Sequence, residues 1–262
     1  MSETVLLQVD EQVATITLNR PQKLNAFTDE MLFALIERID QCEQDPEVRA
    51  VILTGNGRGF CAGGDVSAMG AEADNRPLTT KNHVSEAIQA FPKRMASFNK
   101  PIIAAVNGVA AGGGMDLTLA CDIRTAGRSA TFAETYAKIG LLPGGGGAYY
   151  LPRIIGVSKA LEMLLTAEFI DADEAYSLGL VNHVFDDDSL LAETRLIAKK
   201  MASLPPYSVM NIKRTVYQSL NAELPAALDI VGSHIAIAKA SADHAEAISA
   251  FREKRPGNYI GS

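Results

Sequence analysis

The sequence predicts an α/β fold, with strands and helices mixed over residues 1–200 and a helical region over residues 201–262. Three observations support this prediction. A hairpin pattern occupies residues 5–18, where two strand-like segments flank three polar residues. Residues 102–106 are apolar without alternation, which is typical of a strand covered on both faces. Strand signals end with residues 180–185, and helical spacing of apolar residues continues beyond them.

Composition and charge exclude several classes of function. Hydrophobic residues make up 47% of the 262 residues and charged residues 21%, which is ordinary for a globular protein with a sizeable core. The net charge of −7 argues against nucleic acid as a partner, because phosphate binding needs a basic face. No signal peptide and no apolar run of roughly 18 residues is recognisable, so we expect a cytoplasmic protein with no membrane partner. The three cysteines show no paired spacing and indicate neither a disulfide framework nor a metal site.

The first half of the chain begins with a capped helix after the hairpin. Thr28 precedes two acidic residues and is predicted to cap this helix. Apolar residues at helical spacing predict its buried stripe: Met31, Leu35, Ile39 and Cys42. A strand is expected at residues 48–54. Residues 71–82 are polar and are expected to be irregular, and Pro92 is expected to interrupt the helical pattern that follows them.

The second half of the chain is mainly helical. Short strands are expected at residues 122–126 and 130–134. Helices are then predicted at 158–166, 171–178, 189–203, 206–220 and 225–254. Asp171 and Glu174 form a capping pair for the second of these helices. The last helix would overhang a single core, so we expect it to pack on a neighbouring subunit.

A glycine-rich loop at residues 55–66 invites comparison with dinucleotide-binding loops. The pattern Gly-x-Gly-x-x-Gly fails here, because Phe60 stands where the third glycine should be. The sequence also lacks the Gly-Lys-Ser/Thr of a phosphate loop. What remains is a loop able to expose several backbone N–H groups, or a glycine-rich turn without chemical importance.

Residues 104–121 form the stretch around which the chain is organised. A buried strand leads to a turn, to three glycines at 112–114, and then to a helix with Asp116 in its first turn. Bare backbone at a helix start offers free N–H groups to an anion or a polarised oxygen. A neighbouring acid could then move a proton beside an enolate. The alternative is that the glycines allow close packing and Asp116 only caps the helix.

Taken together, these motifs resemble the crotonase superfamily, the enoyl-CoA hydratase and isomerase family. The resemblance rests on Gly-Phe-Cys-Ala-Gly-Gly-Asp at 59–65 and Asn-Gly-Val-Ala-Ala-Gly-Gly-Gly at 107–114. Further motifs appear in the expected order at 18–21, 25–26, 120–123, 140–147 and 151–153. The resemblance implies a spiral of ββα turns and a C-terminal helical region that forms a homotrimer or a dimer of trimers. It also implies an acyl-CoA thioester as substrate, with no cofactor beyond the coenzyme A of that substrate.

The resemblance assigns an oxyanion hole to the backbone N–H groups of Gly64 and Gly113. In the family, two such groups hold the thioester oxygen and stabilise the enolate that forms beside it. Losing one donor of this kind costs on the order of 10²–10³ in rate in other enzymes.

The catalytic carboxylates are where the sequence departs from the family pattern. Family hydratases use two glutamates, and these positions hold Asp116 and Tyr136 here. A tyrosine with its ordinary pKa near 10 cannot replace a carboxylate base, but it can donate a hydrogen bond or a proton. A third acid used by some relatives falls on Gly144. Glu134 lies two residues before Tyr136 and, in an extended segment, faces the same way, so it is a candidate substitute or a structural residue.

The same comparison suggests residues for substrate binding. The loop that contains Ala62 and Asp65 would receive the adenine and pantetheine. Lys23 and Arg58 are candidate phosphate neighbours, with solvated surface charges as the alternative. His83 lies in the segment that lines the acyl pocket in relatives, with an exposed or core histidine as the alternative.

These residues predict an enzyme that acts on an acyl-CoA, and three functions stay open. The first is reversible hydration of a 2-enoyl-CoA, which the overall similarity favours. The second is isomerisation of an enoyl-CoA or dienoyl-CoA double bond, which needs only one base and is favoured by the missing second glutamate. The third is an acyl-CoA binding protein that has lost catalysis.

Overall fold

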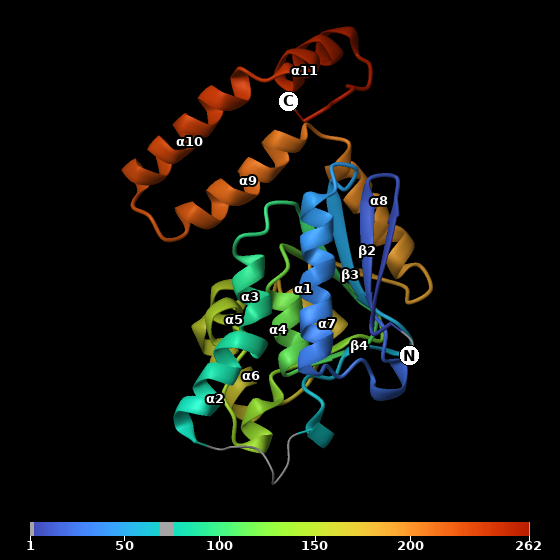
Figure 1. Ribbon diagram of the computed structural model, residues 1–262, viewed down its shortest axis with the longest axis vertical. Coiled ribbons are helices and arrows are strands. Elements are labelled where there is room, and N and C mark those ends of the chain that lie inside the picture. The colour runs from blue at the N-terminus through green and yellow to red at the C-terminus, as the bar shows by residue number, and fades with distance from the viewer. Residues whose placement is uncertain (1–2, 69–75, 262) are drawn as a thin grey trace.

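The computed structural model describes residues 3–68 and 76–261, which form two sheets surrounded by helices (Figure 1). The larger sheet has the order β1-β2-β3-β5-β7-β10 and the smaller one the order β4-β6-β8-β9. The larger sheet contains β1 Val5–Asp10, β2 Val13–Leu18, β3 Ala50–Gly55, β5 Ile102–Val106, β7 Ile123–Gly127 and β10 His183–Phe185. The smaller sheet contains β4 Gly59–Cys61, β6 Val109–Ala111, β8 Thr131–Ala133 and β9 Ile170–Asp171.

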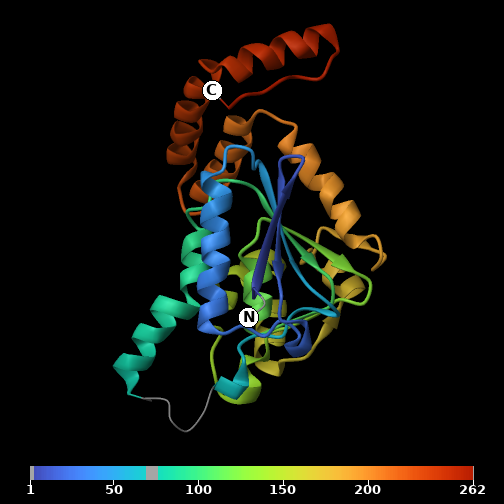
Figure 2. The same cartoon turned by 45° about the vertical axis from the view of Figure 1, so that its right-hand side comes forward.

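The larger sheet confirms the predicted hairpin and the predicted buried strands. β1 and β2 pair antiparallel, and β2, β3, β5, β7 and β10 then pair in parallel. Every residue of β3 and of β5 is buried, because helices cover both faces of the sheet. Figure 2 shows the sheet between helices α1 (Asp29–Gln44) and α8 (Leu190–Ala202).

Alternate residues of β3 divide between the two faces. Val51 and Leu53 belong to the core cluster that contains the buried side of α1, whereas Ala50 and Ile52 pack with α8. The stripe predicted for α1 is buried as expected, and the Thr28 hydroxyl accepts a hydrogen bond from the N–H of Met31 at 3.4 Å. The capped amphipathic helix at 29–44 is therefore confirmed.

The smaller sheet turns the chain into a spiral. β4, β6 and β8 each follow a strand of the larger sheet after a short connection, and they pair with one another in parallel. A helical segment follows each of them before the next turn begins. This arrangement confirms the expected mixed α/β fold built from ββα turns, and it gathers the three short connections at one end of the molecule.

The segment before β5 differs from the prediction. Residues 71–75 lie outside the described residues, but the remainder of the stretch expected to be irregular forms α2, Pro77–His83. A π-helical turn at Val84–Ile88 and then α3, Ala90–Met95, follow it. Pro92 lies in the first turn of α3, where its missing N–H would have no helical partner. The helical pattern is therefore interrupted between the π-helical turn and α3, just before Pro92.

The remaining helices are α4 Gly113–Leu119, α5 Gly147–Ile155, α6 Val157–Thr166, α7 Ala172–Ser177, α9 Pro206–Ser219, α10 Leu224–Lys239 and α11 Ala242–Glu253. Short 3₁₀ helices occupy Pro21–Lys23, Val66–Ala68 and Thr135–Ile139. Asp171 caps α7 as predicted, through a hydrogen bond from the N–H of Glu174 at 2.8 Å. Helix α5 was not predicted, because four consecutive glycines and Pro152 obscure its start and interior.

The C-terminal region corrects one prediction. Residues 225–254 were expected to form one long helix, but they form α10 and α11 with a break at Ser241, whose hydroxyl accepts the N–H of His244 at 3.1 Å. A serine with this local capping geometry ends one helix and starts the next. Figure 1 shows α9, α10 and α11 extending beyond the sheets. In the described residues, no helix is long and apolar enough to cross a membrane.

Helix α4 is buried over its whole length and contacts β4, β6 and α5. Its fit depends on Gly114. A side-chain carbon at Gly114 would lie 2.0 Å from the Cys61 carbonyl oxygen, a backbone atom that has no freedom to move away. The bare backbone at this position therefore allows α4 to contact β4.

We expect Gly114→Ala to lower the free energy of unfolding by more than about 2 kcal/mol, because overpacking against backbone forces both segments apart. Gly232→Ala is the matched control: Gly232 lies inside α10 with open space around it, so the alanine should raise helix stability by roughly 0.5–1 kcal/mol. Urea unfolding followed by circular dichroism measures both. Equal effects of the two substitutions would contradict the close contact.

Candidate active site

Two glycine loops meet at the start of α4. The N–H of Phe27 donates to the Gly63 carbonyl at 2.8 Å, and the N–H of Asp65 donates to the Phe27 carbonyl at 2.9 Å. The N–H of Gly64, which lies between Gly63 and Asp65, takes part in neither hydrogen bond. A side-chain carbon at Gly63 would lie 3.5 Å from the nitrogen of Gly113, so the two loops are in close contact.

The two predicted oxyanion donors have no acceptor in the described part of the chain. No hydrogen bond there uses the N–H of Gly64 or of Gly113. The N–H of Gly113 is free because it lies in the first turn of α4, where no helical acceptor exists. The ring of Phe27 covers Gly113, since a side-chain carbon at this glycine would lie 2.5 Å from Phe27 Cζ. Two free donors beside one apolar wall can bind a polarised oxygen.

Asp116 lies one turn into α4 and is 2% exposed. Its Oδ2 atom accepts hydrogen bonds from the Tyr136 hydroxyl and from the N–H of Gly145, the latter at 3.0 Å. Its Oδ1 atom has no hydrogen-bond partner in the described residues. The protein thus holds one carboxylate oxygen by hydrogen bonds and leaves the other, which is also buried, without one in the described residues.

Glu134 is the second acid at this site and is fully buried. A side-chain carbon at Gly147 would lie 2.4 Å from Glu134 Oε1 and 2.7 Å from Asp116 Oδ1. The two oxygens are therefore no farther apart than the sum of these distances. Both carboxyl oxygens of Glu134 lack a hydrogen-bond partner among the described residues, which is costly for a buried polar group unless a ligand or water satisfies them.

Burial raises the pKa of both carboxyl groups, and the shift is larger for Glu134. Burial is the main cause for Glu134, and the neighbouring negative charge of Asp116 adds to it. Burial also dominates for Asp116, but the Tyr136 hydroxyl and backbone N–H groups oppose it by stabilising the ionised form. Since the environments separate the two pKa values, Glu134 retains its proton at neutral pH more readily than Asp116 does.

Tyr136 lies in the 3₁₀ helix Thr135–Ile139 and points its hydroxyl at Asp116. Burial raises the pKa of this hydroxyl, and the Asp116 carboxylate raises it further. The side chain therefore stays protonated and acts as a donor. A side-chain carbon at Gly113 would lie 3.4 Å from the Tyr136 oxygen, so the hydroxyl is also close to the oxyanion donors.

The predicted substrate-binding residues occupy different surroundings. Ala62 is half-buried, and its N–H donates to the Leu24 carbonyl at 3.0 Å. Asp65 is buried and pairs with Arg20 at 2.8 Å, and hydrogen bonds from Ser67 and Arg20 lower its pKa to about 2. Both residues thus stabilise the loop that presents Gly64, and sequence reasoning missed the Arg20 contribution.

The three side chains predicted to lie near phosphates or the acyl chain are exposed. Lys23 lies in the 3₁₀ helix Pro21–Lys23, and Arg58 lies in the glycine loop between β3 and β4. His83 ends α2, and its Nε2 contacts Asp29 Oδ2 at 2.7 Å. None of the interactions of His83 in the described residues involves Gly64, Gly113 or Asp116.

Gly145 and Gly147 are two further site residues that the sequence alone did not reveal. Residues 140–147 are recognised from the sequence as a family motif, but their contacts were not predicted. Gly145 donates to Asp116, and the absence of a side chain at Gly147 leaves room for both acids. In the described residues, no cluster of three or more His, Cys, Asp or Glu could hold a metal ion.

Comparison with known proteins shows the family to which the chain belongs. The family model for enoyl-CoA hydratase/isomerase matches residues 8–262. The chain is 37% identical over 261 residues to 1,2-epoxyphenylacetyl-CoA isomerase of Escherichia coli (strain K12), with 100% of both chains covered. It is 33% identical over 259 residues to crotonyl-CoA hydratase of Syntrophomonas wolfei, with 98% of each covered.

Comparison with solved structures indicates the same family. The crystal structure of enoyl-CoA hydratase from Bacillus anthracis matches with a TM-score of 0.93 and 33% identity, over 99% of this chain and 100% of that one. The chain therefore belongs to the enoyl-CoA hydratase/isomerase family and has the crotonase fold. It is an enzyme of the enoyl-CoA hydratase/isomerase type, as the sequence motifs predicted.

Proposed function

We propose that this protein catalyses the reversible hydration of a 2-enoyl-CoA, with Asp116 and Glu134 as its proton-transferring pair. The supporting observation is that two buried carboxyl groups from separate elements meet at Gly147, close to the Tyr136 hydroxyl and the free N–H groups. Hydration needs one group to take a proton from water and another to deliver one to carbon. The crotonyl-CoA hydratase of Syntrophomonas wolfei, a relative over nearly the whole chain, bears the name of this activity.

The oxyanion hole stabilises the negative charge that develops on the thioester oxygen during the reaction. When water adds to the β-carbon, electrons shift to the thioester oxygen and an enolate forms. The N–H groups of Gly64 and Gly113 hold that oxygen and stabilise its negative charge. They are set in place by backbone contacts, so they need no reorganisation during the reaction.

The two acids divide the proton transfers. Asp116 Oδ1 accepts a proton from the attacking water as the water oxygen bonds to the β-carbon. Protonated Glu134 gives its proton to the α-carbon as the enolate collapses, which completes the addition of water. A proton must then pass from Asp116 to Glu134 to reset the pair, and their proximity at Gly147 favours that transfer.

Isomerisation of a double bond is the second candidate. One base can remove a proton from one carbon and return it to another, and Asp116 is held in place for this by Tyr136 and Gly145. The Escherichia coli relative is named as an isomerase of 1,2-epoxyphenylacetyl-CoA, which is an epoxide. Binding without catalysis is the weaker alternative, since free oxyanion donors and an unpartnered acid would have no purpose in it.

The remaining contacts follow the family resemblance. The loop at Ala62 and Asp65 would receive the adenine and pantetheine, and exposed Lys23 and Arg58 would lie near the phosphates. His83 would lie beside the acyl chain. The proposed enzyme needs no metal or redox cofactor for this reaction, because the thioester itself accepts the electrons. We place it in the cytoplasm.

We expect Asp116→Asn and Glu134→Gln each to lower kcat with crotonyl-CoA roughly 10²–10⁴-fold, the range that general acid–base catalysis contributes. Loss of the enoyl-thioester absorbance measures turnover, and binding of a saturated acyl-CoA should be retained. Asp188→Asn and Glu168→Gln, at exposed positions, are the matched controls and should leave kcat unchanged.

If Asp116→Asn alone lost activity, and 3-enoyl substrates were turned over instead, isomerisation would replace hydration. If neither acid mattered, the catalytic assignment would be wrong.

We expect Tyr136→Phe to move the acid limb of the kcat/KM profile to higher pH. The hydroxyl stabilises ionised Asp116 and lowers its pKa, so its removal raises that pKa. Asp116 must be ionised to act as a base, and activity would therefore be lost at a higher pH as the solution is acidified. Tyr176→Phe, at an exposed position on α7, is the control. An unchanged acid limb would exclude Tyr136 as a partner of the base.

We also infer that residues 201–262 form the trimer interface. Ile212 and Val216 on α9 and Leu220 directly after it follow one another at four-residue spacing, and they are 64%, 54% and 66% exposed. Such an apolar stripe on the surface is typical of an interface. We expect light scattering to give the mass of a trimer or of a dimer of trimers.

Val216→Asp with Leu220→Asp should then give monomers, whereas Leu196→Asp, at an exposed position on α8, should not. A monomeric wild-type protein would contradict the inference.

A further inference from the structure

Phe27 contacts both of the segments that carry the proposed oxyanion donors. Its N–H donates to the Gly63 carbonyl and its carbonyl accepts the N–H of Asp65, so its main chain holds the loop on either side of Gly64. Its ring reaches the other donor. A side-chain carbon at Gly113 would lie 2.5 Å from Phe27 Cζ and 2.7 Å from its Cε1. One residue therefore connects the two N–H groups.

The main chain of Phe27 is fixed by the residues on both sides of it. Thr28 follows directly and caps α1, and a hydrophobic residue just before such a cap commonly fixes the angle at which the chain enters the helix. On the other side, Arg20 donates to the Ala26 carbonyl and pairs with the Asp65 carboxylate at 2.8 Å. The ring of Phe27 thus starts from a fixed point, and the residue is only 8% exposed.

The three glycines at the start of α4 lack a side chain for different reasons. Gly112 has a φ of +50°, in the left-handed region. At Gly114 a side-chain carbon would meet the Cys61 carbonyl oxygen of the backbone. Gly113 has no positive φ, and the atoms nearest to a side-chain carbon there belong to the ring of Phe27. The ring therefore occupies the place that a side chain at Gly113 would take.

An oxyanion hole depends on how accurately its donors are placed. Donors that are fixed before the reaction stabilise the developing charge without reorganisation, and a misplacement of about 1 Å can cost on the order of 10²-fold in rate. A glycine segment has wide conformational freedom and no side chain of its own to pack. The buried ring beside Gly113 supplies the missing packing contact.

We propose that Phe27 is a positioning residue of the oxyanion hole: its main chain holds the Gly64 loop, its ring supports Gly113, and its length sets the separation of the two N–H groups. The proposal rests on the function proposed above, in which these two groups bind the thioester oxygen. Phe27 acts on the substrate only through the two glycines. A shorter side chain would leave Gly113 without support.

The stretching frequency of the thioester carbonyl measures this effect directly, because hydrogen bonds to the oxygen polarise the C=O bond and lower its frequency. The probe is butyryl-CoA with an isotopic label at the thioester carbon, a saturated ligand that cannot be hydrated. In infrared difference spectra, we expect the wild-type protein to lower the frequency relative to the free ligand. In Phe27→Leu the frequency should move back towards the free value.

Turnover of crotonyl-CoA gives a second readout. We expect Phe27→Leu to lower kcat on the order of 10²-fold with little change in KM, because the hydrogen bond from a displaced donor is lost mainly in the transition state. Phe27→Met should recover part of both readouts, since its long and flexible side chain can fill the space beside Gly113.

Phe27→Tyr tests the same contact in the opposite direction, and it keeps the core filled if Phe27→Leu does not fold. Cζ is the ring atom nearest to the side-chain direction of Gly113, so an added hydroxyl would press on this glycine. We expect the carbonyl frequency to move towards the free value and kcat to fall in this variant as well.

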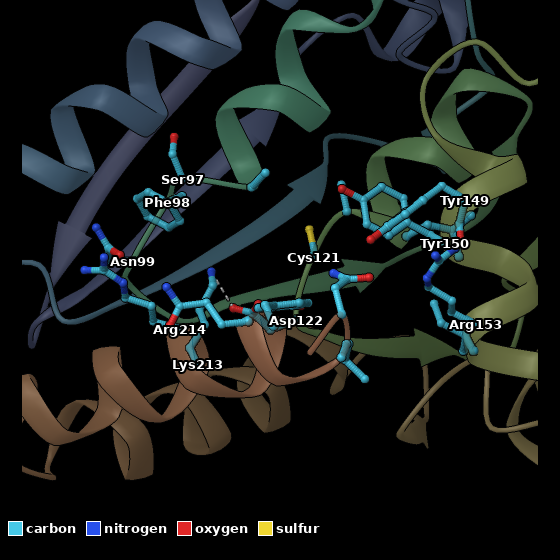
Figure 3. A pocket seen from close by; sticks show the side chains of 18 of the residues that line it. Ser97, Phe98, Asn99, Cys121, Asp122, Tyr149, Tyr150, Arg153, Lys213 and Arg214 are labelled. Atoms are coloured by element: carbon cyan, nitrogen blue, oxygen red, sulfur yellow. Dashed lines mark hydrogen bonds and ion pairs between the residues drawn. The ribbon is translucent and has the colours of Figure 1, made fainter. Parts of the chain in front are cut away.

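Phe98→Leu is the matched control. Phe98 is 2% exposed and belongs to the same hydrophobic core as Phe27. It lies at a separate cavity of about 730 Å³ between the segment after α3 and helices α5 and α9, as Figure 3 shows, and neither Gly64 nor Gly113 lines this cavity. This substitution should lower the free energy of unfolding and leave the carbonyl frequency and kcat unchanged.

An unchanged carbonyl frequency and an unchanged kcat in Phe27→Leu would overturn the proposal. So would equal changes in Phe27→Leu and Phe98→Leu, since that result marks a general effect of core packing. Absence of a frequency shift in the wild-type protein would refute the oxyanion hole and this proposal with it. Absence of wild-type turnover, with a shift that Phe27→Leu removes, would refute the hydratase function and leave the positioning role standing.

Discussion

The close contact between α4 and the glycine loop after β4 is the constraint on which the site depends. Gly114 has no room for a side chain against the Cys61 carbonyl, and Gly63 approaches the nitrogen of Gly113. This contact brings the N–H groups of Gly64 and Gly113 together and sets Asp116 one turn away. Arg124 donates to the carbonyl groups at the other end of the helix, where a positive charge complements the helix dipole.

Burial determines the chemistry of the two acids. An exposed aspartate and an exposed glutamate would both be ionised at neutral pH and could not share acid and base roles. Here Tyr136 and Gly145 stabilise the charge of Asp116, whereas Glu134 has no such donors among residues 3–68 and 76–261. This difference in hydrogen bonding separates the pKa values of two carboxyl groups that look alike in the sequence. In the proposed mechanism, Glu134 and the Tyr136 hydroxyl together replace the family glutamate that is absent at position 136.

Prediction from sequence succeeded where the signal is local. The hairpin of β1 and β2, the cap at Thr28 and the buried stripe of α1 follow from spacing and side-chain chemistry within one segment. It failed where tertiary contacts or capping override propensity. Residues 77–83 are polar yet helical, residues 225–254 divide at Ser241, and α5 forms despite glycines and Pro152.

The order of motifs along the chain determined the family and the α/β fold, and it predicted Gly64, Gly113 and Asp116 as site residues. These conclusions need only the types of residue and their spacing. The tertiary structure alone decided that Glu134 joins Asp116 at Gly147, and that the ring of Phe27 covers Gly113. The physical reason is that packing of separate elements sets the distances between their side chains. The same packing removes those side chains from water. No local pattern records either quantity.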